Sequence, residues 1–545
     1  MMKKRVLGLF LVMVMLLGVL AACGNKNSGG RIDKSDIFTR YEYGSEFGLA
    51  SKEAIKVPKL AEMEYEHVDT TELIEMLENL TEKVPEYTDA KAFFEDYYKV
   101  YELYKEFQSS WVICYLRYSQ DTSDDYYIDE YNYCNEQSDI VGEDFSDLYA
   151  AFAESPLKEE LEEKYFCKGF FDDYKGYESA SEHYFELKDE ESALEMEYLT
   201  LRSDKDWYES YDKVAEIFIE LVKVRQEIAK ERGYDNYVDY IYKEGFNRDY
   251  TPEQVRIFLD SVKEYMVPLT KDIYASDITY GSSDTNELVT KLYDATQEMG
   301  GPIAQAAKFL TTYELYDLDY NEKKRNIGYT WYIPKYEAPM IFGNTDAYRT
   351  LCHEFGHFTE ALYDYDDWTV DTDTAEIYSQ AMEYLAMSYT PDFTEEMKTK
   401  YLKESLAVLL RSLKGTCIGG DFELQIYSLN PEELTASKIE EIYRSCQSDY
   451  NGFDDRRDWI WTHHYFDFPG YYISYGTSVI PSMLIAKEEY EEKGAGVERY
   501  IKLLNRTSGK HFLASLEEAG IANPFEEETI KGAAEFLKEF FNLNK

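Results

Sequence analysis

The stretch "TLCHEFGHFTEAL", Thr350–Leu362, places two histidines four residues apart and a glutamate directly after the first. On a helix, residues i and i+4 share one face with their Cβ atoms about 5–6 Å apart. His353 and His357 can therefore bind one ion at the about 2.0–2.1 Å of a zinc–nitrogen bond. Glu354 is turned by about 100° from His353, which suits it to hold a water on that ion rather than to be a ligand. The pattern predicts a site for one zinc ion.

The third ligand of this site has to come from another element. Glu360 lies about 10 Å from His353 along the helix axis, which is too far to close a tetrahedron. The next expected helix, "DTAEIYSQAMEYLAM", presents Glu376 in its first turn, and we take Glu376 as the third ligand. Asp371 and Asp373 are the alternatives from the preceding loop.

Two more polar residues share the helix face of Glu376. Gln380 and Glu383 follow it at i+4 and i+7. Glu383 could accept a hydrogen bond from the N–H of a ligand imidazole, or it could be a solvated or structural carboxylate.

Three protein ligands with an open fourth position are typical of catalytic rather than structural zinc sites. Zinc lowers the pKa of a bound water to about 7, so a zinc-bound hydroxide is available at neutral pH. We expect Glu354 to take the proton of that water, and the hydroxide to attack a carbonyl. Glu354 then passes the proton to the leaving amine. The expected reaction is peptide hydrolysis.

A second cluster, "HHYFDFPGYYISYGTS", runs from His463 to Ser478. A tetrahedral intermediate needs hydrogen-bond donors at its oxyanion, and tyrosine hydroxyls and imidazole N–H groups can supply them. With 53 tyrosines in the chain, any single tyrosine is more often structural. The cluster as a whole is the candidate, and its donors are His463, His464, Tyr471, Tyr472 and Tyr475.

The elements that must position these residues are mostly helices. Nearly everything after residue 70 carries apolar residues at helical spacing, which predicts a mainly α fold. Helix starts are expected at Thr251–Glu253 and Asn430–Glu432, and helix ends at Gly233 and Gly300. Only Tyr316–Asn344 has short β-rich pieces divided by prolines, so we expect a small sheet beside the histidine helix.

The N-terminus reads as a lipoprotein signal. A basic start and a short apolar run predict a signal peptide over residues 1–22, and "LAAC" ends at Cys23, which would carry the lipid. The alternative is an ordinary signal peptide with an incidental cysteine. We expect a flexible tether over residues 23–32, an N-terminal helical region over 33–205 and a catalytic region over 206–545. The protein would sit at the outer face of a bacterial cytoplasmic membrane, held by its acyl chains.

The net charge of −50 argues against nucleic acid and anionic lipid surfaces as partners. It fits solubility outside the cell, with attraction of cationic peptides as a lesser alternative. Apart from Cys23, the six cysteines form no close pair such as C-x-x-C, which excludes a zinc ribbon and a redox motif. We expect them to be mostly buried small residues, although disulfides stay possible: Cys114, Cys134, Cys167, Cys352, Cys417 and Cys446.

The sequence resembles the thimet oligopeptidase and oligoendopeptidase F family of zinc metallopeptidases, and is closer to oligoendopeptidase F. The resemblance covers "HEFGH", "AEIYSQAMEYL" with Glu376, and "RNIGYTWYIPKYEAPMIFGN" before the histidine helix. It also covers "EIAKERGYDNYVDYIYKEGFNRDYTPEQV" and the tail "GVERYIKLLNRTSGKHFLASLEEAGI". It reaches from about residue 210 to the end of the chain, with a weaker helical match before.

The resemblance implies a helical ellipsoid around a deep channel, and therefore short, unstructured peptides as substrates. We expect the protein to be a monomer. It implies that His463, Tyr472 and Tyr475 assist the intermediate, with Tyr472 as oxyanion donor. His464 is then a substrate contact. The doubled histidine departs from the family pattern, so the resemblance leaves open whether His463 or His464 faces the substrate. The turn before Glu376 is also shorter than usual. A strand edge is expected to pair with the substrate backbone, made of Pro339, Met340, Ile341, Phe342, Gly343 and Asn344.

Three functions remain open. The leading one is a lipid-anchored zinc oligoendopeptidase. The second is a dipeptidyl carboxypeptidase or other exopeptidase on the same scaffold, which needs a cationic group for the terminal carboxylate. The third is a catalytically silent peptide-binding lipoprotein, and Glu354 speaks against it because binding does not need a carboxylate beside two metal ligands.

Overall fold

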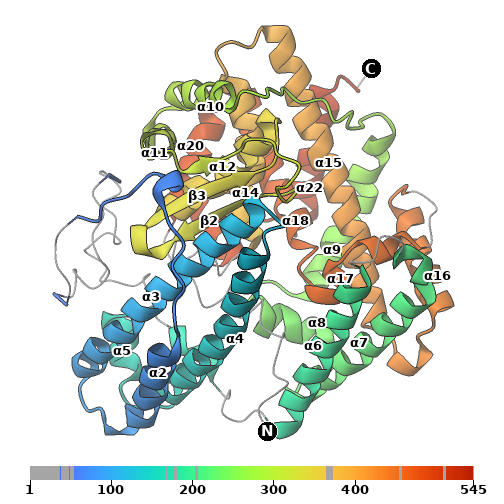
Figure 1. Ribbon diagram of the computed structural model, residues 1–545. Helices are drawn as coiled ribbons and strands as arrows, with labels where there is room; N and C mark the ends of the chain where they lie inside the picture. Colours follow the sequence, from blue (N-terminus) through green and yellow to red (C-terminus); the bar gives the residue numbers. More distant parts are fainter. Residues whose placement is uncertain are drawn as a thin grey trace.

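The computed structural model describes residues 37–38, 48–49, 54–166, 169–175, 181–202, 207–363, 372–452, 457–506 and 511–543. The predicted signal peptide and tether, with Cys23, lie outside these residues, as do Cys167 and Asp371. The chain is mainly α-helical with one small β-sheet, as the sequence predicts (Figure 1).

The helices before the sheet form two groups. The first four enclose an apolar core of their own, rich in phenylalanine and tyrosine, and the second half of α3 and Cys134 of α4 also join the main core into which α6 and the later helices pack. The boundary expected near residue 205 stays a prediction. The helices are α2 (Thr71–Lys83), α3 (Ala90–Gln120), α4 (Asp125–Ala153), α5 (Lys158–Lys164), α6 (Glu182–Arg202), α7 (Tyr211–Glu231), α8 (Tyr237–Tyr240), α9 (Pro252–Ser261), α10 (Thr285–Met299) and α11 (Gly301–Thr312).

Capping residues set most of the helix ends that the sequence predicts. Thr251 closes a capping box over α9, with Pro252 in the first turn. Gly300 ends α10 at φ 74°, a left-handed backbone that favours glycine. The start expected at Asn430 is only a 3₁₀ turn, because the chain becomes extended again at Leu434. The α-helix begins after the cap Thr435 instead.

The sheet has three strands, β1 (Tyr316–Asp317), β2 (Gly328–Ile333) and β3 (Ala338–Gly343), in the order β1-β3-β2. β3 pairs in parallel with β1 and antiparallel with β2. It is therefore the middle strand, and all six of its residues are buried. The helix that follows, α12 (Tyr348–Tyr363), packs against β2 and β3.

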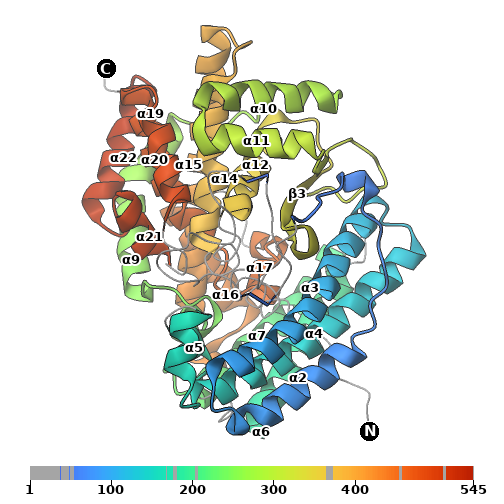
Figure 2. The ribbon, with the colours of Figure 1, turned by 90° about the vertical axis from the view of Figure 1, so that its left-hand side faces the viewer.

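The C-terminal half continues as helices. Figure 2 shows α19, α20 and α22 grouped beside α9, and the long α15 packs against α14 and α18. They are α14 (Thr372–Tyr389), α15 (Glu395–Ile426), α16 (Ala436–Asp449), α17 (His464–Asp467), α18 (Ser474–Thr477), α19 (Val479–Glu491), α20 (Ala495–Leu504), α21 (Phe512–Ala519) and α22 (Glu527–Phe540).

None of the helices in the described part of the chain has the length and apolar character to cross a membrane. The described cysteines are free and buried: Cys114, Cys134, Cys352, Cys417 and Cys446. They pack as small apolar side chains, as expected.

Candidate active site

The structure gathers the three predicted ligands. His353, His357 and Glu376 each present one ligand atom, and these atoms lie within 4.8 Å of one another. Glu376 Oε2 is 3.8 Å from His353 Nε2 and 3.9 Å from His357 Nε2. Tetrahedral ligands at zinc bond lengths stand about 3.3 Å apart, so small side-chain adjustments suffice for one such ion. No other trio of this kind occurs among the described residues.

Gly356, inside the "HEFGH" motif, lets the third ligand reach the histidines. A Cβ at this position would lie 2.4 Å from the carbonyl oxygen of Tyr378 and 2.5 Å from Cα of Ser379. Helices α12 and α14 therefore meet backbone to backbone, which any larger residue would prevent. The close crossing brings Glu376, less than one turn before Tyr378, to the histidine face of α12.

Hydrogen bonds orient two of the three ligands. Glu383 Oε1 is 2.8 Å from His353 Nδ1, so it acts as the outer acceptor that the sequence offered as one of two alternatives. An N–H at Nδ1 leaves Nε2 free for an ion. Ser379 donates to Glu376 Oε2 at 3.0 Å. Burial opposes a charged ring, but Glu383 raises the pKa of His353 to about 9, so binding a metal displaces a proton from it.

Glu354 lies on the β2 side of α12 and is only 5% exposed. Thr330 on β2 donates to Glu354 Oε2 at 3.0 Å and to its backbone oxygen at 2.9 Å. A Cβ at Gly328 would lie 2.8 Å from Glu354 Oε1, so the glycine leaves space for that oxygen. Burial raises the pKa of Glu354 to about 7, against the effects of His353 and Thr330. A carboxyl near neutrality can both take and return a proton.

The tyrosine that lies near the metal ligands is Tyr471 rather than Tyr472. Burial and the charge of Glu376 raise the pKa of Tyr471, and burial, Tyr471 and Glu376 raise that of Tyr475. The pKa of Tyr472 is raised by burial and Asp458 instead. Its ring packs on α15, where a Cβ at Gly419 would lie 2.4 Å from Tyr472 Cδ1. The role of Tyr472 as oxyanion donor therefore stays a prediction from the resemblance, whereas the charge of Glu376 acts on Tyr471 and Tyr475.

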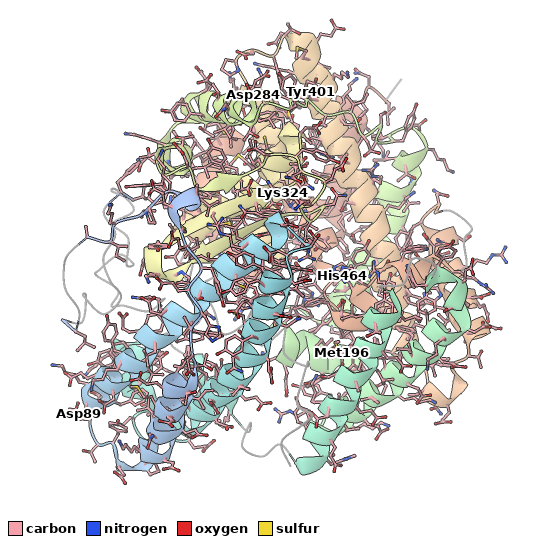
Figure 3. The ribbon with its side chains drawn as sticks, viewed as in Figure 1. Asp89, Met196, Asp284, Lys324, Tyr401 and His464 are labelled. Carbon is pink, nitrogen blue, oxygen red and sulfur yellow. The ribbon has the colours of Figure 1, made fainter. Side chains whose placement is uncertain are left out.

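The two neighbouring histidines have different surroundings. His464 stacks on Tyr471 with ring centroids 5.6 Å apart, and its centroid is 5.9 Å from that of Tyr475. Figure 3 places His464 beside α6, the helix that carries the labelled Met196. His463 stands one ring further out and its Nδ1 lies 2.9 Å from Asp467 Oδ1. The structure thus favours His464 as the histidine that lies beside Tyr471 and Tyr475.

Burial, followed by the charge of His463, lowers the pKa of His464 to about 3. This ring is therefore neutral near pH 7, and a neutral imidazole keeps one N–H to donate. That property suits a hydrogen bond to an oxyanion, which His463 was expected to provide.

The predicted substrate edge, Pro339–Asn344, is wrong. Both sides of β3 already carry a strand, and its residues are buried. Asn344 instead joins a loop, since it accepts from the backbone N–H of Asn321 at 2.8 Å and donates to its carbonyl at 2.9 Å. The edge strand beside Glu354 is β2, and no strand of the described residues pairs with its outer side.

The structure gives other partners to the residues considered as third ligands. Asp373 accepts hydrogen bonds from Tyr250 and Thr477, and Glu360 pairs with Arg506 at 3.4 Å in full burial. Sequence reasoning missed Thr330 and Gly328. The alternation of β2 puts positions 328, 330 and 332 on one face, but nothing in the sequence says which face meets α12.

Comparisons with known proteins agree with this fold and site. Residues 60–175 match the family description "Peptidase M3 N-terminal domain", and residues 304–535 match "Peptidase family M3". Together these matches cover more than half of the chain. A search of curated proteins found no match.

Solved structures give the same fold at low identity. Pz peptidase A with an inhibitor is 23% identical with a TM-score of 0.76, over 89% of this chain and 99% of the other. A protein of Bacillus anthracis str. Ames, provisionally described as oligoendopeptidase F, is 22% identical with a TM-score of 0.74, over 90% and 99%. The M32 carboxypeptidase of Deinococcus radiodurans R1 is 12% identical with a TM-score of 0.55, over 87% and 100%.

A helical fold with two histidines, a glutamate ligand and a second glutamate beside them defines a metallopeptidase. The chain belongs to peptidase family M3.

Proposed function

We propose that this protein is a zinc-dependent endopeptidase that hydrolyses short, unstructured peptides with Glu354 as general base. The observation that carries the proposal is the trio of ligand atoms within 4.8 Å of one another, with Glu354 one position along the same helix. Two imidazoles and one carboxylate are a donor set of catalytic zinc. A zinc ion bound there supplies a Lewis acid that polarises the scissile carbonyl and acidifies a water.

Glu354 moves the proton. Its Oε2 is held by Thr330, which leaves Oε1 to accept the proton of the attacking water. A pKa of about 7 lets the same carboxyl return that proton to the leaving amine at neutral pH. Burial under β2 keeps other water away from the carboxylate.

Tyr471, Tyr475 and His464 are proposed to donate to the oxyanion. The raised pKa values of both tyrosines keep their phenols protonated, and the neutral ring of His464 keeps one N–H. Donors that are fixed before the reaction stabilise the developing charge without reorganising. This assignment replaces the one expected for His463 and Tyr472.

The substrate backbone is proposed to pair with the outer edge of β2. An open strand edge offers backbone N–H and C=O groups to an extended peptide. Gly328 begins this strand and lies against Glu354, so a peptide paired there has its backbone beside the base. A peptide must be extended to pair in this way, which excludes folded proteins.

A carboxypeptidase is the second candidate, and Arg349 favours it. This residue lies four positions before His353, on the same face of α12. Its Nη1 is buried without a hydrogen-bond partner among the described residues, and its Nε is 3.9 Å from Glu383 Oε2. A guanidinium in that position could hold a terminal carboxylate by two parallel hydrogen bonds.

The proposed location follows from the N-terminal sequence. The mature chain is anchored by acyl chains on Cys23 at the outer face of a bacterial cytoplasmic membrane, and acts there as a monomer. The net charge of −50 of the full sequence disfavours nucleic acid as a partner.

The test uses internally quenched peptides with both ends blocked. We expect the purified protein to cleave them, a chelator to stop cleavage and added zinc to restore it. Glu354→Gln should lower kcat by at least about 100-fold, the low end of what a general base contributes, while zinc affinity stays the same. Glu395→Gln is the matched control, because the Glu395 side chain is 95% exposed.

Cleavage of blocked peptides that survives in Glu354→Gln would falsify the mechanism. If only peptides with a free carboxyl end are cleaved, and Arg349→Gln abolishes that preference, the carboxypeptidase is the correct function. Zinc binding without any cleavage supports a binding protein instead.

A further inference from the structure

Asp373 lies in the first turn of α14, three residues before Glu376, and is almost completely buried. Its carboxylate accepts from Tyr250 Oη at 3.1 and 3.0 Å and from Thr477 Oγ1. Arg248 Nε lies 3.4 Å from Asp373 Oδ2, and the two side chains are 2% and 3% exposed. The free energy that two charges lose when they are removed from water is about as large as the attraction they gain in a buried ion pair. A contribution to stability therefore does not explain why this pair is present.

A second nitrogen of the Arg248 guanidinium contacts residues Gly470–Ser478, which we call the tyrosine segment. Arg248 Nη2 donates to the carbonyl of Gly470 at 2.9 Å and to Ser474 Oγ at 2.7 Å. These two residues directly precede Tyr471 and Tyr475. One planar guanidinium therefore joins the first turn of α14 to both ends of the segment that carries the proposed oxyanion donors.

Aromatic rings hold the guanidinium in its place. Its central carbon lies 4.2 Å from the ring centroid of Tyr242, 4.5 Å from that of Phe246 and 5.3 Å from that of Tyr250. Arginine stacks on rings and donates along fixed directions, which lysine cannot reproduce. The orientation of the Arg248 guanidinium is therefore fixed before a substrate binds.

A second contact joins the same elements two turns further along α14. Gln380 Nε2 donates to the carbonyl of Tyr475 at 3.3 Å and to Ser478 Oγ at 2.9 Å. Asp373 and Gln380 thus flank Glu376 on α14 and attach to the tyrosine segment on either side of it. The same set of hydrogen bonds therefore connects the helix that carries the ligand with the segment that carries the donors.

We propose that Arg248 and Asp373 are positioning residues that keep Tyr471 and Tyr475 in register with Glu376. The inference rests on the proposed function for its effect on rate, but the ordering of Gly470–Ser478 does not depend on catalysis. Neither residue touches the substrate or the metal; they act through the backbone of the tyrosine segment and the first turn of α14.

The experiment compares Arg248→Gln, Arg248→Lys, Asp373→Asn and Thr477→Val. Arg499→Lys is the matched control, since Arg499 also joins a carboxylate, Glu488 at 2.9 Å, to a backbone carbonyl, Ala519 at 2.6 Å, on other helices. Three quantities are measured: amide hydrogen exchange over residues 470–478, zinc affinity, and kcat and KM separately.

We expect faster amide exchange over residues 470–478 in all variants of Arg248, Asp373 and Thr477. Their zinc affinity and KM should stay close to those of the wild type. A misplacement of about 1 Å can lower a rate about 100-fold, so kcat should fall by about 10- to 100-fold in Arg248→Gln and Asp373→Asn. Arg248→Lys should recover part of that loss, and Thr477→Val, which removes one hydrogen bond, should lose least. Arg499→Lys should match the wild type throughout.

Unchanged exchange over 470–478 in the variants overturns the proposal, and so does an unchanged kcat in zinc-loaded Arg248→Gln. A parallel fall of zinc affinity, KM and kcat also overturns it, because that result means general damage. If Arg248→Gln and Asp373→Asn do not fold, the two conservative variants decide by the same measurements. A wild type that cleaves no peptide refutes the proposed function, whereas the exchange data still test whether Arg248 and Asp373 order the tyrosine segment.

Discussion

Glu354, Thr330 and Gly328 show how single residues adapt a carboxylate for proton transfer. The carboxylate is buried, one of its oxygens is held by a hydroxyl, and the other faces a residue without a side chain. Burial raises the pKa of Glu354, and the Thr330 hydrogen bond works in the opposite direction. The pKa of this base therefore depends on its burial and on the charge of His353, and also on a hydroxyl from a strand that lies before the histidine helix in the chain.

Thr330→Val tests this balance. Valine keeps the shape but removes the donor, so the pKa of Glu354 should rise. The base must be ionised to act, and activity falls as pH drops through its pKa. The acidic limb of kcat/KM should therefore move to higher pH, by less than about one unit for one hydrogen bond. A pH–rate profile that coincides with the wild type, or moves to lower pH, contradicts the assignment.

Sequence and structure agree on some residues of the site and differ on others for a physical reason. Two histidines at i and i+4 of a helix lie on one face, so His353 and His357 could be predicted as ligands of one ion without knowledge of the fold. Tyr471 and Tyr472 differ by one position, and one residue turns a side chain by about 100°. Which of the two tyrosines lies near Glu376 depends on how residues 470–478 pack on α14 and α15. The local spacing of residues does not determine this packing.

At the level of elements, the helices could be predicted and the sheet order could not. Helical periodicity and capping residues are local signals, and they predicted the start of α9 and the helices that contain Thr350–Leu362 and Asp373–Met387. The edge strand was misassigned because β1 contributes only two residues, Tyr316 and Asp317. So short a strand has no readable pattern, yet it makes β3 the middle strand and leaves β2 at the edge.

The crossing of α12 and α14 gives an element-level prediction. Gly356→Ala puts a Cβ within 2.4 Å of the backbone of α14, so the helices must separate and Glu376 must withdraw from the histidines. We expect zinc affinity to fall at least about 10-fold, within the range seen for lost supporting contacts at metal sites. Stability should fall by about 1–3 kcal/mol, as in overpacked cores. Equilibrium zinc competition and thermal unfolding measure the two effects.

Gly415→Ala is the control for that variant. Gly415 lies within α15 and a Cβ there meets nothing within 4 Å, so alanine should be neutral or stabilise by about 0.5–1 kcal/mol. A Gly356→Ala protein that binds zinc like Gly415→Ala would show that the close crossing is not required.

For the whole molecule, the N-terminal sequence predicts where the protein works. Cys23→Ser should prevent lipid attachment and release the protein from the membrane fraction, with unchanged peptidase activity, because the anchor lies far along the chain from the site. Cell fractionation and mass measurement of the mature N-terminus check this. A variant that stays in the membrane fraction, or a wild type without acyl chains, rules out the lipoprotein assignment.

The stability of the whole molecule should depend on one buried carboxyl outside the metal site. Burial raises the pKa of Glu423 on α15 to about 7, although the N–H of Gly470 donates to it at 2.8 Å. The folded state therefore holds this proton more tightly than the unfolded state. Stability contributed by the protonated carboxyl is present below pH about 4.5 and is lost as pH rises to about 7.

Glu423→Gln removes that loss, because a neutral amide can still accept from Gly470 and has no proton to release. Relative to wild type, the variant should be equally stable at pH 4 and more stable above pH 7, by on the order of 1–3 kcal/mol. Thermal unfolding across this pH range measures the difference, with the exposed Glu395→Gln as control. A constant difference between Glu423→Gln and wild type at all pH values means that the carboxyl is already ionised in the folded protein, and that Arg225 and Arg248, whose charges lower its pKa, outweigh its burial.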